Sequence, residues 1–256
     1  MRFEFALISA AVGLAAGQTL NIPTRVGSIV SLASPSVISG SKDMGNKEYD
    51  RGRACDTDAD TGSDSAVFIL ENGATLSNVI IGKDQLEGIH CKGACTLKNV
   101  WFRDVCEGKQ PMLRFHTDIT NQTTDAISAL GNGNVLIEGG GAQEASDKVV
   151  QHNGRGTVTI KNFTVINAGK LYRGCGDCTN NGGPRNVNIS GVKAKGVSEL
   201  VGINSNYGDV ANIQSTCGSS VKKVCQEYKG VNKGSGSSSK VTTTANCKGQ
   251  TSLSAC

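Results

Sequence analysis

A seven-residue pattern recurs through the middle of the chain. In each copy, an apolar or β-branched residue is followed by Asn or Gly and then by another apolar residue. The copies begin at Thr75, Thr96, Leu136, Thr159 and Asn188. Asn and Gly most readily adopt the left-handed backbone that a sharp bend requires. Short strands joined by bends and repeated every two dozen residues or so are typical of a solenoid. We therefore predict an all-β chain of stacked parallel strands.

One step of this repeat is too long. From Thr96 to Leu136 there are 40 residues, against 21 from Thr75 to Thr96 and 23 from Leu136 to Thr159. The segment 108–124 accounts for the excess and lacks the Gly, Val and Asn rhythm around it. It can be interpreted as a short retained intron, because its residues can be encoded with splice signals and its removal joins the flanking codons in frame. The alternative is a surface loop, although loops above about 12–15 residues are uncommon. Transcript sequencing distinguishes the two.

The start of the chain predicts export. Arg2 precedes an apolar run from Phe5 to Ala16, and small residues lead up to Gln18. This is the pattern of a secretory signal peptide, and it is too short for a membrane anchor of about 20 apolar residues. We therefore predict a signal peptide over 1–17 and a secreted, extracellular, soluble domain over 18–256. That domain ends in a Gly-, Ser- and Thr-rich tail over 230–256.

Ten cysteines support an exported protein. An even count in such a chain favours disulfides, whose pairing the sequence leaves open. The alternative is a zinc site built from Cys91, Cys95, Cys175 and Cys178, whose close spacings resemble ligand pairs. Cys247 and Cys256 predict that the tail is fastened to the domain. Aromatic residues make up only 4% of the chain, too few for a base-stacking nucleic-acid platform.

Acidic and basic residues follow successive copies of the repeat. The acids are Glu87, Glu107 and Asp125, and the cations are Lys148, Lys170 and Arg173. Residues at equal offsets in a solenoid stack on one face, so these groups could converge. Carboxylate oxygens suit Ca²⁺, whereas the alternative is an ordinary solvated charged face. For His90 and His152 a packing or hydrogen-bonding role is favoured over catalysis, because no nucleophile motif accompanies them.

Longer motifs around these residues resemble a known family. They are Val105-Cys-Glu107 followed after the insert by Asp125-Ala126, Asp147-Lys-Val-Val-Gln-His-Asn153, Gly169-Lys-Leu-Tyr-Arg-Gly-Cys175 and Gly202-Ile-Asn-Ser-Asn-Tyr-Gly208. Together they resemble the secreted pectate lyases of polysaccharide lyase family 3, from about residue 22 to residue 228. The resemblance implies a right-handed, single-stranded parallel β-helix. It also implies calcium-dependent cleavage of polygalacturonate, the pectate of plant cell walls, by β-elimination.

By the same resemblance, the family's metal-binding acids fall on Glu87, Glu107 and Asp125, and its essential basic residues fall on Lys148, Lys170 and Arg173. Calcium on the uronate carboxylate would stabilise the enolate-like intermediate. A lysine base needs a pKa below its ordinary value of about 10.4, which neighbouring cations would favour. We therefore expect Lys148 to be the base, with Lys170 and Arg173 neutralising and orienting the uronate.

Two other functions stay open. A β-helix glycoside hydrolase would use paired carboxylates, and three cations at its site would have no obvious role. A catalytically impaired isoform could instead hold calcium or pectate without cutting, because the insert separates Glu107 from Asp125. The expected partner is polygalacturonate, the expected cofactor is Ca²⁺, and the protein is expected to be a monomer that contacts neither nucleic acid nor membrane.

Overall fold

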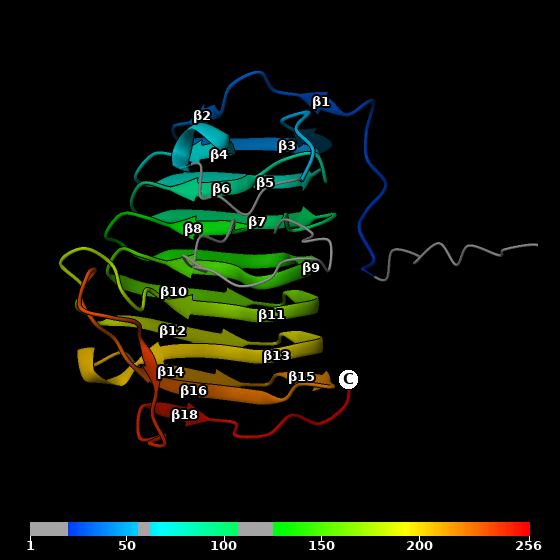
Figure 1. Cartoon of the computed structure of the whole chain (residues 1–256). Helices are drawn as coiled ribbons and strands as arrows, with labels where there is room; N and C mark the ends of the chain where they lie inside the picture. Colours follow the sequence, from blue (N-terminus) through cyan, green and yellow to red (C-terminus); the bar gives the residue numbers. More distant parts are fainter. Residues whose placement is uncertain (1–19, 56–61, 107–124) are drawn as a thin grey trace, which may run out of the picture.

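The computed structural model describes residues 20–55, 62–106 and 125–256. The predicted signal peptide, the segment 108–124 and Glu107 lie outside the described residues. No helix in the described ranges is long and apolar enough to cross a membrane. Figure 1 shows the strands stacked coil upon coil from the N-terminal to the C-terminal end. The predicted parallel β-helix is therefore confirmed.

Each coil contributes strands to three faces, which we name face A, face B and face C. Face A contains β2 (Ser36–Ile38), β4 (Ala66–Leu70), β6 (Glu87–Cys91), β8 (Ile127–Ala129), β16 (Lys223–Lys229) and the ends of the long strands β9 (Val135–His152), β11 (Thr164–Gly174) and β13 (Lys193–Asn204). Two short 3-10 helices, Gly62–Ser65 and Ser205–Tyr207, also adjoin this face.

The other two faces share several bent strands. Face B contains β10 (Gly156–Lys161), β12 (Arg185–Ser190), β14 (Ala211–Gln214), β18 (Cys247–Gly249) and the starts of β3 (Ser41–Asp50), β5 (Ala74–Ile81), β7 (Cys95–Phe102) and β9. Face C contains β1 (Val30–Ser31), β15 (Cys217–Ser219), the ends of β3, β5 and β7, the middle of β9 and the starts of β11 and β13. All of these pairings are parallel. Only β17 (Ser239–Lys240) pairs antiparallel in the described chain.

The repeat seen in the sequence sets the register of face B. Thr75 pairs with Thr96, Thr96 with Leu136, Leu136 with Thr159, and Thr159 with Asn188. All five copies of the pattern therefore begin at the same position of successive coils. Further coils continue the ladder at Ser41, Asn212 and Lys248, where the sequence pattern is too weak to be recognised.

The bend between face B and face C uses the predicted residues. Asn78, Asn99 and Asn162 each have a φ of 51°, and Gly139 takes the same left-handed place with a φ of 69°. Asn99 Nδ2 donates to Asn78 Oδ1 at 3.1 Å, so neighbouring bends are linked. A Cβ on Gly139 would lie 2.3 Å from Asn99 Oδ1. The prediction that Asn and Gly make the bends is confirmed.

The interior is filled by columns of similar apolar side chains. One of them runs through β5, β7, β9, β10, β12 and β14 and consists of Leu76, Leu97, Ile137, Ile160, Ile189 and Ile213. Each of these side chains is at most 1% exposed. Burying one such side chain is worth about 1.5–3 kcal/mol. Stacking in register thus gives each coil its stability through its two neighbours.

The cysteines form five disulfides. They are Cys55–Cys106, Cys91–Cys95, Cys175–Cys178, Cys217–Cys256 and Cys225–Cys247. The preference for disulfides over zinc is confirmed, because each close-spaced pair is bonded within itself. The last two bridges join the tail to β15 and β16, so the tail is fastened as predicted.

Candidate active site

Charged residues line one column on face A. Ile89 pairs with Ile127 and Ile127 with Val150, so Glu87, Asp125 and Lys148 occupy equivalent places in successive coils. Lys148 pairs with Lys170, Lys170 with Glu199, and Glu199 with Lys223. We call this set of six residues the charged column. Acids occupy its first part and lysines its middle, so opposite charges meet at Asp125 and Lys148.

Lysines of the column pair with Asp125, which belongs to the column, and with Asp147, which precedes Lys148 in β9. Lys148 Nζ lies 3.7 Å from Asp125 Oδ1 and also pairs with Asp147. Lys170 Nζ lies 2.6 Å from Asp147 Oδ1. Burial acts to raise the pKa of Asp147, but its pairing with the two lysines outweighs burial and keeps that pKa below its ordinary value. Asp147 thus holds both ammonium groups at the centre of face A.

Asp147 was missed as a site residue in the sequence. The motif that carries Lys148 begins with this acid, so a signal was present. The sequence predicted a cluster of cations here. That expectation gave no role to an acid, so Asp147 was not recognised.

The two described acids of the predicted metal site are both buried. Glu87 is 3% and Asp125 7% exposed. The backbone N–H of Gly88 donates to the Asp125 carbonyl at 3.2 Å, which joins their two coils. His90 Nε2 lies 3.3 Å from Glu87 Oε2. No cluster of three or more potential metal ligands occurs among the described residues; the third predicted acid, Glu107, lies outside them. The metal assignment therefore stays a prediction.

Arg173 lies three residues beyond Lys170 in β11 and is 7% exposed. Its Nη1 donates to the carbonyl of Gly174 at 2.6 Å and to Asn204 Oδ1 at 3.0 Å. Its Nη2 donates to Ser238 Oγ at 2.8 Å. The guanidinium carbon lies 3.9 Å from the centre of the Tyr228 ring, a cation–π contact. Burial lowers the pKa of Arg173, although an arginine stays charged in proteins.

Glu199 follows the two lysines in the column. It contacts Tyr228, whose ring packs against Arg173. It accepts hydrogen bonds from the Tyr228 hydroxyl at 2.8 and 3.0 Å. Burial raises the pKa of Glu199 and also that of Tyr228. The sequence reading missed Tyr228 and Ser238, which come from the C-terminal part of the chain and meet Arg173 only in three dimensions.

His152 belongs to the core rather than to the site. It is fully buried, and its Nδ1 lies 2.8 Å from the Tyr172 hydroxyl. Burial, with Arg185 as the lesser cause, lowers the pKa of His152 from 6.5 to about 3. The packing and hydrogen-bonding role favoured for this residue agrees with its position. His90, in contrast, contacts a predicted metal ligand.

The neutral form of His152 makes stability depend on pH. In the unfolded chain this residue takes up a proton near pH 6.5, whereas in the folded chain it does so only near pH 3. Its contribution is therefore complete above pH 6.5 and is lost as the pH falls towards 3. Between pH 6.5 and 4.5 we expect the free energy of unfolding to drop by about 2 kcal/mol from this group. Denaturant titrations of the His152→Gln variant should show a shallower acid dependence, and parallel profiles for the two proteins would contradict the assignment.

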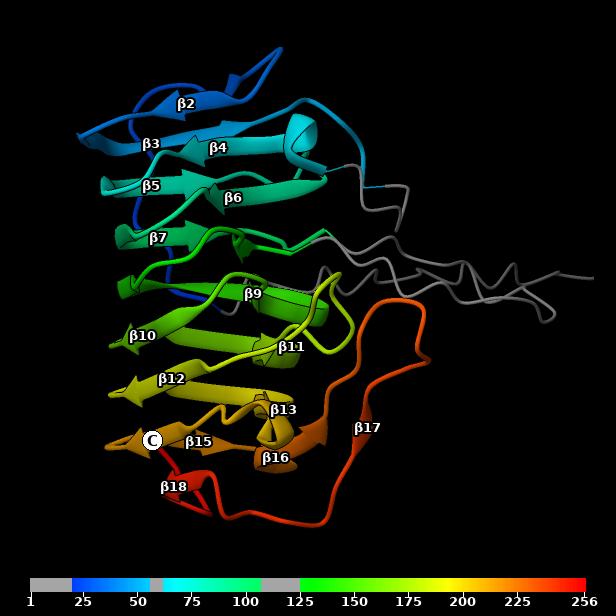
Figure 2. The same cartoon turned by 90° about the vertical axis from the view of Figure 1, so that its left-hand side faces the viewer.

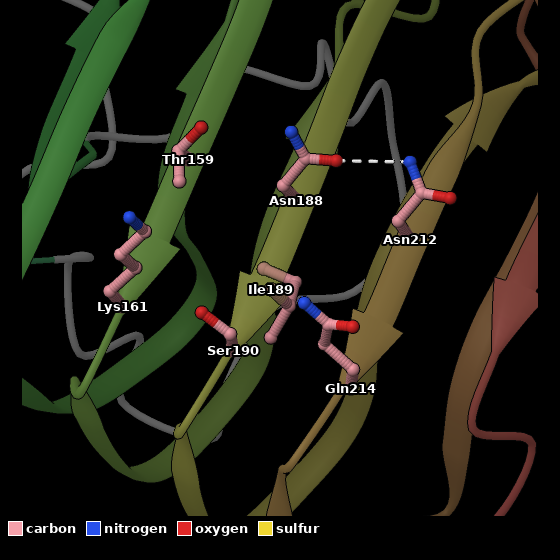
Figure 3. Close-up of a pocket in the computed structure, with 7 residues that line it drawn as sticks. All are labelled: Thr159, Lys161, Asn188, Ile189, Ser190, Asn212 and Gln214. Carbon is pink, nitrogen blue, oxygen red and sulfur yellow. Dashed lines mark hydrogen bonds between the residues drawn. The ribbon is translucent and has the colours of Figure 1, made fainter.

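A polar hollow lies on a different face. It has a volume of about 530 Å³ and opens on face B over β10, β12 and β14 (Figure 3). Its lining consists of Thr159, Lys161, Asn188, Ile189, Ser190, Asn212 and Gln214. The Nδ2 of Asn212 donates to Asn188 Oδ1 at 3.0 Å across it. The hollow shares no residue with the charged column, so the two are separate features.

Comparisons with known proteins agree with this architecture. The family model described as "Pectate lyase" matches residues 19–235. The "Probable pectate lyase E" of Neosartorya fischeri is 49% identical over 245 residues, covering 92% of this chain and 86% of the relative. The "Pectate lyase E" of Emericella nidulans is 50% identical over 216 residues, covering 84% of this chain and 77% of the relative.

Solved structures of pectate lyases also superpose on this chain. The catalytic domain of pectate lyase PelI from Erwinia chrysanthemi superposes with a TM-score of 0.65 at 32% identity and covers 89% of this chain and 97% of that chain. PelI in complex with tetragalacturonic acid gives a TM-score of 0.63 at 34% identity, over 86% of this chain and 67% of that chain.

Proposed function

The chain belongs to the pectate lyase family, and from this premise we propose that it cleaves α-1,4-polygalacturonate by calcium-dependent β-elimination on face A. The observation that carries the proposal is the charged column, in which Asp125 and Lys148 form an ion pair and Asp147, beside the column, pairs with both Lys148 and Lys170. Acids alone would suit a glycoside hydrolase. Lysines beside acids suit a reaction that binds a polyanion and removes a proton.

The calcium would be held at the acidic end of the column. Glu87 and Asp125 supply carboxylate oxygens on adjacent coils, and these hard donors fit Ca²⁺ rather than a metal that prefers nitrogen or sulfur. Glu107, which directly follows Cys106 in the chain, is the third proposed ligand. When bound, calcium would withdraw charge from the uronate carboxylate and acidify the neighbouring C–H bond.

Lys148 is the proposed base. It lies where the acidic and basic parts of the column meet, 3.7 Å from Asp125 Oδ1. In the reaction the base takes the proton on the carbon next to the carboxylate. The electron pair of that C–H bond forms a double bond to the adjacent carbon, and the bond from that carbon to the glycosidic oxygen breaks. The oxygen leaves with its electron pair and takes up a proton from water, so it ends as a hydroxyl.

Asp147 would set where Lys148 lies. It pairs with Lys148 and Lys170 together, so one carboxylate fixes the positions of both side chains. Binding of the uronate carboxylate next to these lysines offers Lys170 a second anionic partner. Asp147 is therefore proposed as the residue that positions Lys148, with Lys170 neutralising the substrate.

Arg173 is proposed to bind the uronate carboxylate. Its three donated hydrogen bonds to protein leave two of its five N–H groups, on the neighbouring nitrogens Nε and Nη2, without a partner in the described chain. Two parallel N–H groups match the two oxygens of a carboxylate. Since Arg173 is nearly buried, a carboxylate bound there would be shielded from water, which strengthens the interaction.

The proposed setting of this reaction is extracellular. Five disulfides require an oxidising compartment, and the apolar N-terminal run has the features of a signal peptide. We propose that the protein is secreted and acts as a monomer on plant cell-wall pectate. Gel filtration of the mature chain at several concentrations tests the monomeric state.

One assay separates the possible activities. Polygalacturonate is incubated with the protein, with calcium or with a chelator, and ultraviolet absorbance and reducing ends are recorded. We expect calcium-dependent absorbance, because β-elimination leaves an unsaturated sugar at the new end. Reducing ends without absorbance would indicate a hydrolase. If neither signal appears but the protein still binds pectate, the chain is a binding isoform, and the same assay on a version without residues 108–124 tests whether the insert is responsible.

A further inference from the structure

A strap from the C-terminal region runs beside the stacked coils (Figure 2) and contacts Arg173. It comprises residues 230–246, between β16 and β18, and Figure 2 shows it as a long loop beside the stacked coils. Its base is closed by the disulfide Cys225–Cys247. Halfway along, β17 pairs antiparallel with the end of β16, Tyr228 opposite Lys240. The strap is therefore tied down at its base and at its middle.

Further hydrogen bonds fix the path of the strap. The N–H of Val231 donates to the Gly176 carbonyl at 2.8 Å, and the N–H of Lys233 donates to the Cys178 carbonyl at 3.1 Å. On the return path, the N–H of Asn246 donates to Glu227 Oε1 at 2.6 Å. The first two contacts hold the first part of the strap against the segment that follows β11, the strand of Arg173, and the third holds its end against β16.

The strap contributes one side chain to the surroundings of Arg173. Ser238 is half-buried, whereas its neighbour Ser237 is exposed. Ser238 Oγ accepts the Nη2 hydrogen bond at 2.8 Å, and a Cβ on Gly176 would lie 2.7 Å from Ser238 Cβ. Gly176 thus leaves the room in which Ser238 reaches the guanidinium.

Ser238 holds the end of the guanidinium that the other contacts of Arg173 do not bind. The hydrogen bonds from Nη1 fix one end of the guanidinium, and the Tyr228 ring supports its plane. Rotation that swings Nη2 is opposed by Ser238 alone among the described side chains that accept from this nitrogen. A uronate carboxylate needs two donors in a fixed direction, so the direction of Nη2 decides how well it is bound.

We propose that Ser238 is a positioning residue for Arg173, and that the strap thereby sets the preference of the site for charged over esterified uronate. The inference rests on the proposed role of Arg173 in binding the carboxylate. Ser238 itself does not need to touch the substrate. A methyl ester carries no charge and presents no carboxylate pair of oxygens, so it gains little from a fixed guanidinium.

Binding of tetragalacturonate and of its methyl ester tests this proposal. Kd is measured by calorimetry with calcium present, in a Lys148→Met background that slows cleavage. The variants are Ser238→Ala, which removes the hydroxyl, Ser238→Thr, which retains it, and Ser237→Ala as the matched control. Far-ultraviolet circular dichroism and thermal melting confirm that each variant is folded.

We expect Ser238→Ala to weaken tetragalacturonate binding about tenfold, equivalent to about 1.4 kcal/mol, which is close to the lower end of the range for a hydrogen bond to a charged group. Binding of the methyl ester should change by less than about twofold, and Ser238→Thr and Ser237→Ala should bind both ligands like the parent. Equal losses for both ligands, or no loss for either, would overturn the positioning role.

An Arg173→Met variant keeps the two levels of the proposal apart. If it loses tetragalacturonate binding while Ser238→Ala does not, only the role of the strap is wrong. If Arg173→Met binds tetragalacturonate as tightly as the parent, the proposed carboxylate-binding role of Arg173 itself fails. In that case the further inference fails with it.

Discussion

Replacing Lys148 by Met should lower kcat on polygalacturonate by about 10²–10⁴-fold, the range associated with loss of a positioned base. Methionine has nearly the length of the lysine stem but cannot accept a proton. Lys170 remains 2.6 Å from Asp147, so the charged column keeps part of its contacts. Initial rates are followed by the ultraviolet absorbance of unsaturated ends. KM should change much less than kcat, because the base acts in the transition state.

The matched control for this variant is Lys161→Met. Lys161 lies on face B at the polar hollow, away from the charged column, so this change removes the same charge without touching the proposed site. Its rate should equal that of the parent. A Lys148→Met protein with undiminished kcat would assign the base to another group.

A methyl group added at Gly140 should destabilise the fold by more than about 3 kcal/mol, in the upper range of single substitutions. Gly140 lies in β9 with a φ of 91°, and a Cβ there would be 2.0 Å from the carbonyl oxygen of Val100 in the coil before it. The backbone of Val100 cannot give way, because its own pairing with Gly140 holds the two coils in register. We expect the melting temperature to fall by roughly 6–12 °C.

Gly73→Ala separates the clash from the cost of the left-handed backbone. Gly73 has a similar φ of 84°, but no atom lies within 4 Å of an added Cβ. This change should cost only about 1–2 kcal/mol. Equal melting temperatures for the Gly140→Ala and Gly73→Ala variants would mean that the coils can move apart to admit a methyl group.

The fold could be predicted because the sequence repeat itself sets the register of the coils. Thr75, Thr96 and Thr159 mark the same place in their coils, and the Asn three residues after each makes the bend. Ser41 and Asn212 occupy equivalent places in coils that the pattern did not reveal. There the neighbouring coils impose the strand, although the local residues alone do not specify it.

The candidate site was predictable only in part. Similar offsets after the repeats placed Lys148 and Lys170 together, and a register shift between Ala168 and Lys170 absorbs the difference of one residue. The environment of Arg173 could not be predicted in this way. Ser238 lies 65 residues further along the chain, in a Gly- and Ser-rich stretch without periodicity, and only the folded tail brings it to the guanidinium.

Because the coils stack uniformly, equivalent charges on successive coils are evenly spaced for a polymeric ligand. Neighbouring parallel strands lie about 4.8 Å apart, so the residues of the charged column are spaced along the stack in steps of that length. Four consecutive coils each place one charged residue at this position, namely Lys148, Lys170, Glu199 and Lys223. A substitution can change the charge at a given coil, but it does not change the spacing of the coils. Where homologues differ in the position at which a charge contacts a sugar chain, that position should therefore shift by a whole number of coils. Such shifts would arise through exchanged side chains or through loops at the edges.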